Sequence, residues 1–223
     1  MAVVNRLMGE VLTERELFHR VLQLEQQLTT GGGWQDQIGG VLPGVKVITT
    51  DAGLIPDPRI HYVTPDVLDP ALNKGRALLY YTGLRRLAKN ILRTVVGRYL
   101  DRDREAMRTL RALHAFPPEL SAAMAAKDLK KFGELIDTAW GLKKSIDPDS
   151  TTDVIEGILA RIKPHMYGAT LLGAGGGGFL LIIARSPEDA ERIRAKLESD
   201  PPNGRARFFA YDISKEGLSV TVC

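Results

Sequence analysis

The feature that most restricts the fold is a run of 19 residues without a charged side chain, Met166 to Ala184. The run contains six glycines, and five of them fall within GAGGGG, Gly173 to Gly178. A membrane-spanning helix needs about 20 mostly apolar residues, and the glycines instead divide this run into two short apolar segments. The sequence therefore predicts two buried strands joined by a glycine loop.

The loop GAGGGG formally matches the dinucleotide pattern G-x-G-x-x-G. That pattern binds a pyrophosphate only where a strand precedes it and a helix follows it. FLLIIA follows here and favours a strand, which excludes a Rossmann site, and the absence of G-x-x-x-x-G-K-[ST] excludes a P-loop. A hairpin turn needs only one or two glycines. We therefore interpret the loop as backbone that closely approaches a ligand or another backbone; a flexible hairpin turn is the alternative.

The remaining pattern predicts an α+β chain. Thr13 and Glu16 form a capping box at the start of one helix, and a helical region begins at Leu84 and continues to about Ile146. Ser150 to Thr152, and later Ser186, are suitable N-caps for two further helices. Besides the glycine hairpin, strands are expected at residues 45–50, 59–63, 76–81, 206–214 and 217–222. The C-terminal order of these elements predicts an antiparallel sheet layer backed by helices, similar to the ferredoxin-like group.

A second glycine-rich stretch, TTGGGWQDQIGG, covers residues 29–40. Its three glycines allow an irregular backbone, and Asp36 follows them in a short predicted helix from Gln35 to Gly39. Trp34 offers a rigid wall, while Gln35 and Gln37 offer amide donors. A carboxylate in such company can orient a hydroxyl group and accept its proton. The alternative is a structural role for Asp36 as a helix cap or turn residue.

The net charge and the cysteine content exclude few classes of function. The net charge is +3 and the pI is near 9.0, which is too mild to indicate nucleic-acid binding by itself. Residues 84–113 carry nine Lys or Arg and three acidic residues, and this pattern is typical of a solvated helix face. Nucleic-acid binding is the alternative for this helix, as is a phosphate contact by Arg85 at its start. No His or Cys spacing predicts a metal site, and the single cysteine, Cys223, fits a reducing compartment.

Three segments together resemble the L-fucose kinases of the GHMP small-molecule kinase superfamily: GGGWQDQIGG, YYTGLRRLAKNIL (Tyr80 to Leu92) and LLGAGGGGF. The related D-glycero-D-manno-heptose 7-phosphate kinases share the middle segment, but Trp34 and the four consecutive glycines favour the fucokinase branch. The resemblance implies ATP-dependent phosphorylation of the anomeric hydroxyl of L-fucose, with Mg²⁺, in the cytoplasm. It implies small-molecule substrates, with no nucleic acid and no membrane as partners.

The resemblance also implies roles for residues. Asp36 is expected to be catalytic, and no protein metal ligand is expected. The residues expected to line the substrate and nucleotide cleft are Gly32, Gly33, Trp34, Gln37, Arg85, Gly173, Gly175, Gly176, Gly177 and Gly178. Residues 1–83 are expected to be the remainder of an N-terminal lobe, and residues 84–223 the C-terminal domain.

In that superfamily a further glycine-rich loop holds the ATP phosphates, and it would precede Met1. The resemblance therefore implies an incomplete N-terminal lobe that another chain or domain supplies. It also implies that these 223 residues alone do not turn over ATP and fucose. A non-catalytic fragment that serves as a binding or assembly module is the alternative from outside the enzymes.

Overall fold

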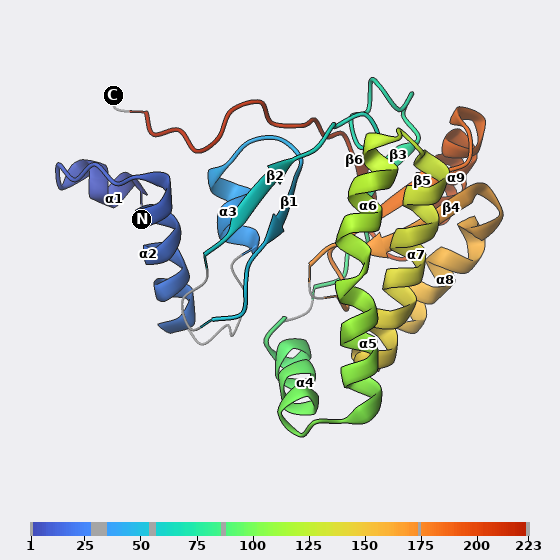
Figure 1. Ribbon diagram of the computed structural model, residues 1–223. Helices are drawn as coiled ribbons and strands as arrows, with labels where there is room; N and C mark the ends of the chain where they lie inside the picture. The colour runs from blue at the N-terminus through green and yellow to red at the C-terminus, as the bar shows by residue number, and fades with distance from the viewer. Residues whose placement is uncertain (1, 28–34, 54–56, 86–87, 174, 222–223) are drawn as a thin grey trace. The chain divides into compact units, whose positions relative to one another are not determined.

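The computed structural model describes residues 2–27, 35–53, 57–85, 88–173 and 175–221 of the 223-residue chain (Figure 1). These residues form two compact units. Unit 1 comprises residues 1–62 and 213–223, and unit 2 comprises residues 63–212. Each unit is described by itself.

Unit 1 contains three helices and a two-stranded sheet: α1 (Ala2–Leu7), α2 (Glu14–Gln27), α3 (Gln35–Val41), β1 (Lys46–Thr49) and β2 (Arg59–Tyr62). The predicted capping box begins α2, because Thr13 Oγ1 accepts the N–H of Glu16 and the Glu16 carboxylate accepts the N–H of Thr13. β1 and β2 pair in antiparallel register with Val47 opposite His61. The helix that carries Asp36 and both predicted strands of this unit are thereby confirmed.

The last described residues of the chain return to unit 1, and the strand predicted at residues 217–222 is wrong for the part that the structure describes, through residue 221. The Leu218 N–H donates to the carbonyl oxygen of Val41 at 2.9 Å. A Cβ on Gly217 would lie 2.5 Å from that same oxygen. The segment therefore satisfies a carbonyl at the C-terminal end of α3, and the Gly44 N–H donates to the carbonyl oxygen of Ser214. Through residue 221, the segment forms no strand.

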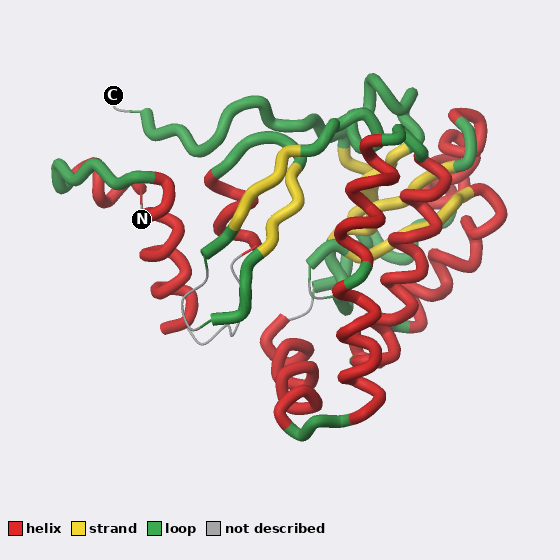
Figure 2. The backbone as a smooth tube through the Cα atoms, in the orientation of Figure 1, coloured by secondary structure: helices red, strands yellow, loops and turns green. Residues whose placement is uncertain are grey.

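Unit 2 is built on a four-stranded sheet with strands β3 (Ala77–Tyr81), β4 (Met166–Leu171), β5 (Phe179–Ala184) and β6 (Arg207–Phe209). The order is β4-β5-β3-β6, and every pairing is antiparallel. Figure 2 shows the strands of both units in yellow. The glycine hairpin is confirmed as β4 and β5, and the strand predicted at residues 206–214 is shorter than expected. The α+β class with an antiparallel sheet and helices is confirmed.

The helices of unit 2 are α4 (Ala88–Leu100), α5 (Arg104–His114), α6 (Phe116–Ala125), α7 (Leu129–Ile146), α8 (Asp153–Ile162) and α9 (Pro187–Ser199), with short 3₁₀ turns η1 (Pro148–Ser150) and η2 (Lys163–His165). Thr152 and Ser186 cap α8 and α9 through their hydroxyl oxygens, as predicted. No helix in the described ranges is long and apolar enough to cross a membrane.

The two faces of the sheet carry different helices, because successive residues of a strand point to opposite faces. Leu180 and Ile182 of β5 join the main hydrophobic core together with Ile155 of α8 and Ile193 of α9. Ile183, the residue after Ile182, lies near Gly133 of α7, on the other face. The hairpin of β4 and β5 therefore packs against helices on both faces of the sheet.

Two sequence boundaries differ from those of the structure. The predicted division at residues 83 and 84 separates β3 from the sheet, whereas β3 pairs with both β5 and β6 and lies inside unit 2. A helix was expected from Leu84, but Leu84 and Arg85 are not helical and the described part of α4 begins at Ala88. The Leu84 carbonyl instead accepts the N–H of Gly178 at 3.0 Å. Assignment of residues 1–83 to an N-terminal lobe remains a prediction.

Candidate functional site

Asp36 lies in the first turn of α3, in unit 1, with an exposed side chain. No described residue donates a hydrogen bond to its carboxylate or forms an ion pair with it. A negative side chain in the first turn of a helix is favoured by the partial positive charge of the helix N-terminus. The carboxylate is thus available to a ligand. Gly32, Gly33 and Trp34, which the sequence places in the same site, lie outside the described residues.

Gln37 occupies a different environment from Asp36. It is buried, and its Nε2 donates to Glu25 Oε2 of α2 at 2.6 Å. Its Oε1 has no hydrogen-bond partner among the described residues. The amide therefore ties α3 to α2, a structural role that the sequence analysis did not identify. Its expected contact with a ligand remains a prediction.

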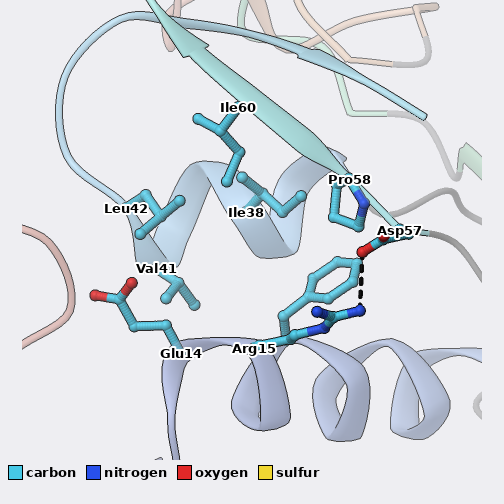
Figure 3. Close-up of a pocket in the computed structure, with 9 residues that line it drawn as sticks. Glu14, Arg15, Ile38, Val41, Leu42, Asp57, Pro58 and Ile60 are labelled. Atoms are coloured by element: carbon cyan, nitrogen blue, oxygen red, sulfur yellow. Dashed lines mark hydrogen bonds and ion pairs between the residues drawn. The ribbon is translucent and has the colours of Figure 1, made fainter.

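A pocket of about 190 Å³ lies between α2, α3 and β2 of unit 1 (Figure 3). Ile38, Val41 and Ile60 contribute apolar surface to it. The Arg15 guanidinium pairs with Asp57 at 2.9 Å, and both side chains are more than 70% exposed. Asp36 does not line this pocket. The pocket is therefore mainly apolar, lies within unit 1, and is not lined by the predicted site residues.

The glycine loop of unit 2 has a backbone that L-residues adopt only with strain. Gly173, Gly175, Gly176 and Gly178 have φ between +73° and +111°. Gly177 does not, so positive φ does not explain its presence. A Cβ on Gly177 would lie 2.8 Å from the Leu84 carbonyl oxygen, which means that close approach of two backbones requires glycine there.

The loop is held from two sides. The Gly176 N–H donates to the carbonyl oxygen of Ser150 in η1, and the Gly178 N–H donates to that of Leu84. Thr82 reinforces the second contact, since its N–H and its hydroxyl both donate to the Gly178 carbonyl, at 2.9 and 3.0 Å. A flexible hairpin turn would lack such anchors. The expected close approach to another backbone is therefore present.

Two cationic residues adjoin the loop. Arg85 directly follows Leu84, is exposed, and precedes α4. Lys143 of α7 was not identified from the sequence, and its ammonium group donates to the carbonyl oxygen of Gly173. No sequence signal would have found Lys143, because its contact joins residues 30 positions apart in a helix and a loop.

Two buried polar groups near the loop were also missed. Asp147 precedes η1 and Ser150 is its last residue, and they are 3% and 0% exposed. Asp147 Oδ1 accepts the N–H of Asp149, but Asp147 Oδ2 and Ser150 Oγ have no partner among the described residues. Within the described ranges, no three His, Cys, Asp or Glu side chains gather as a metal site.

Alanine at Gly175 should distort the loop more than positive φ alone explains. Gly175 has φ +111°, and its added Cβ would meet the Ser150 carbonyl oxygen at 2.7 Å. Gly75→Ala is the matched control, because Gly75 has φ +70° with nothing within 4 Å. We expect the control to lose about 1 kcal/mol of unfolding free energy and Gly175→Ala about 2–3 kcal/mol in denaturant titrations. Equal losses would show that the contact with Ser150 relaxes freely.

Comparison with known proteins gives a consistent result. Residues 120–203 match the family described as GHMP kinases C terminal. The chain is 36% identical over 221 residues to an L-fucokinase/L-fucose-1-P guanylyltransferase of Bacteroides fragilis, covering 99% of the chain and 23% of that protein. It is 36% identical over 181 residues to a bifunctional fucokinase/GDP-fucose pyrophosphorylase of Arabidopsis thaliana, covering 80% and 17%. The chain therefore spans less than a quarter of the length of these curated relatives.

Solved structures show the same fold at low sequence identity. The mevalonate kinase of L. major aligns with a TM-score of 0.67 at 17% identity, covering 93% of this chain and 60% of that one. The galactokinase of Lactococcus lactis aligns with a TM-score of 0.62 at 17% identity, covering 95% and 63%. A putative sugar kinase of Campylobacter jejuni gives 0.64 at 18%, covering 96% and 58%.

Proposed function

We propose that the chain belongs to the GHMP kinase family and acts in a kinase that transfers the γ-phosphoryl group of ATP to the anomeric hydroxyl of L-fucose. The observation that carries this proposal is the 36% identity to the Bacteroides fragilis protein over 99% of the chain, which includes both glycine-rich motifs. The product would be fucose 1-phosphate. An ATP-dependent reaction on a free sugar suits a cytoplasmic enzyme with small-molecule substrates and neither nucleic acid nor membrane as a partner.

Asp36 is the proposed catalytic residue. Its carboxylate is exposed and has no partner among the described residues, so it is free to accept a hydrogen bond from a sugar hydroxyl. In phosphoryl transfer, a carboxylate beside the attacking hydroxyl orients the oxygen and accepts its proton. Trp34, Gly32 and Gly33 are proposed to shape the sugar side of this site, with Gln37 supporting it.

The glycine loop is the part of unit 2 that is proposed to contact a phosphate-bearing ligand. Gly173 and Gly175–Gly178 bring backbone close to the ligand, and Arg85 and Lys143 add positive charge beside them. Phosphoryl transfer demands positioning and charge neutralisation more than covalent chemistry from the protein. A rigid loop bordered by two cations suits that demand.

Magnesium fits the residues present. Mg²⁺ binds through one or two carboxylates together with substrate phosphates and keeps several waters, so it needs no three-residue protein cluster. The ion is therefore proposed to arrive with the phosphates of ATP, while Asp36 acts on the sugar hydroxyl. When bound, the ion neutralises charge on the phosphates of ATP.

Substrate identity is tested by coupled ADP release with ATP and L-fucose, D-galactose or D-glycero-D-manno-heptose 7-phosphate. The assay uses the chain together with the lobe that supplies the ATP-phosphate loop, because the 223 residues alone are not expected to turn over these substrates. We expect release that depends on L-fucose, and a ³¹P signal of a sugar 1-phosphate in the product. Release with the heptose phosphate and none with L-fucose would contradict the proposal and would favour the heptose branch. Binding of ATP and sugar without any turnover would favour a non-catalytic binding module.

A further inference from the structure

Lys143 is a cation held against the glycine loop. It lies in the last turn of α7, and its Nζ donates to the carbonyl oxygen of Gly173, the first residue of the loop. The same Nζ is 5.6 Å from the centre of the Trp140 ring. Trp140 is buried in the core of unit 2. The ammonium group is therefore positioned by a packed helix and a buried ring.

This cation lacks a counterion within the described residues. Its neighbour Lys144 donates to Glu156 at 2.9 and 3.1 Å, whereas no described carboxylate lies within ion-pair distance of Lys143. Asp147 is one helical turn further on, and its Oδ1 accepts the N–H of Asp149. Two adjacent lysines of one helix thus differ, because one is neutralised and the other is not.

An unneutralised, partly buried cation is unfavourable until an anion approaches it. Burial lowers the pKa of the Lys143 ammonium group, because loss of hydration penalises the charged form. An anion beside the amine would offset that penalty. A neutral sugar hydroxyl would not, since it brings no charge.

The loop offers further donors to such an anion. The N–H groups of Gly176 and Gly178 are used by Ser150 and Leu84. Those of Gly175 and Gly177 find no acceptor in the part of the chain that the structure describes. Backbone N–H groups of a glycine-rich loop that have no protein acceptor can donate to an anion, and here they are the alternate groups of Gly175 and Gly177. The Gly173 carbonyl then orients the Lys143 amine toward the same loop.

We propose that Lys143, together with the N–H groups of Gly175 and Gly177, binds the phosphoryl group that is transferred. The proposal rests on the proposed function and names a positioning residue for it. The shared chemistry is a phosphate group, which is either the terminal phosphate of ATP or the phosphate of the sugar product. Lys143 has two further donors besides the one given to Gly173, and these suit phosphate oxygens.

Calorimetric titrations test this inference on Lys143→Met, which keeps the length of the side chain and removes its charge. The ligands are a non-hydrolysable ATP analogue, ADP, L-fucose 1-phosphate and L-fucose. Charge-assisted hydrogen bonds predict about 10-fold to 100-fold weaker binding of the phosphate-bearing ligand that occupies the site. A loss for the ATP analogue but not for ADP assigns the terminal phosphate, and a loss for the sugar phosphate assigns the product. L-fucose itself should bind as before.

Lys143→Arg and Lys144→Met are the matched variants. Arginine keeps the charge and should recover part of the lost affinity, while Lys144→Met removes the neighbouring, already neutralised cation and should bind all ligands normally. Normal binding of every phosphate ligand by Lys143→Met would overturn the inference, as would equal losses in both methionine variants.

A second measurement avoids substitution. The ¹³Cε NMR signal of Lys143 in the unmodified protein should shift on addition of inorganic phosphate, and an unchanged signal at saturating phosphate contradicts the inference. This readout also separates the two hypotheses. If no sugar supports ADP release but Lys143 responds to phosphate, the fucokinase proposal fails and the anion site stands. If turnover is normal but Lys143 does not respond, the anion site fails alone.

Discussion

Replacing Asp36 with asparagine should lower kcat by about 10²-fold to 10⁴-fold and leave the KM for the sugar nearly unchanged. Asparagine keeps the shape of the side chain and removes its negative charge and its ability to accept a proton. If the carboxylate acts mainly on the attacking hydroxyl in the transition state, the ground-state complex loses little. Steady-state kinetics with varied L-fucose at saturating ATP measure both parameters.

The structural alternative predicts a different result for the same variant. Asp36 in the first turn of α3 interacts with the helix N-terminus, and its loss there lowers stability by about 0.3–1 kcal/mol. Such a loss would lower the melting temperature without lowering turnover by folded protein. Asp51→Asn is the control, since Asp51 is an exposed aspartate of unit 1 that pairs with Arg59. Near-normal turnover in Asp36→Asn would return Asp36 to a structural role.

Local sequence signals predicted the elements of this fold well. The capping box of Thr13 and Glu16 and the caps Thr152 and Ser186 act between residues about three positions apart. The glycine hairpin could also be predicted from the sequence, because an uncharged run that glycines interrupt at its centre can form few structures other than two buried strands. Each of these signals depends on neighbours in the chain, which a sequence displays directly.

The sequence did not predict which strands pair when they are far apart in the chain. β3 enters the sheet between β5 and β6, although residues 82–178 separate it from β5 and residues 82–206 separate it from β6. The pattern of RALLYY identifies a strand, but not its partners. For this reason the division predicted at residues 83 and 84 differs from that of the compact units. The return of the C-terminal segment to α3 was missed for the same reason, since it depends on single backbone contacts.

Only part of the candidate site could be predicted from the sequence. A cluster of glycines identifies a special backbone, so the loop could be named as a candidate. Its supports could not be named, because Lys143, Ser150 and Leu84 are ordinary residues in sequence. Gly177 illustrates the limit: the sequence predicted that the loop approaches a ligand or another backbone closely, but not that its partner is the Leu84 carbonyl. The role of Asp36 still rests on its motif.

The seam between α7 and β4 should be the most sensitive point of unit 2. Gly168 of β4 is buried, and a Cβ there would lie 2.0 Å from the Gly133 carbonyl oxygen and 2.7 Å from Asp137 Cβ. A Cβ on Gly133 would in turn lie 2.6 Å from Tyr167 Cβ. The helix and the strand therefore meet backbone to backbone, and neither obstacle at Gly168 is a flexible side-chain end.

Gly168→Ala should accordingly destabilise the protein by about 3 kcal/mol or more, because α7 must move away from the sheet. Gly157→Ala in α8 is the matched control, since its Cβ meets nothing within 4 Å and the site is an exposed helix interior. That control should gain about 0.5–1 kcal/mol. Denaturant unfolding measures both, and a change within about 0.5 kcal/mol for Gly168→Ala would contradict the prediction. Gly168 lies five residues before Gly173, and α7 carries Lys143. A displaced seam should therefore also separate the amine from the glycine loop and weaken phosphate binding in whatever protein remains folded.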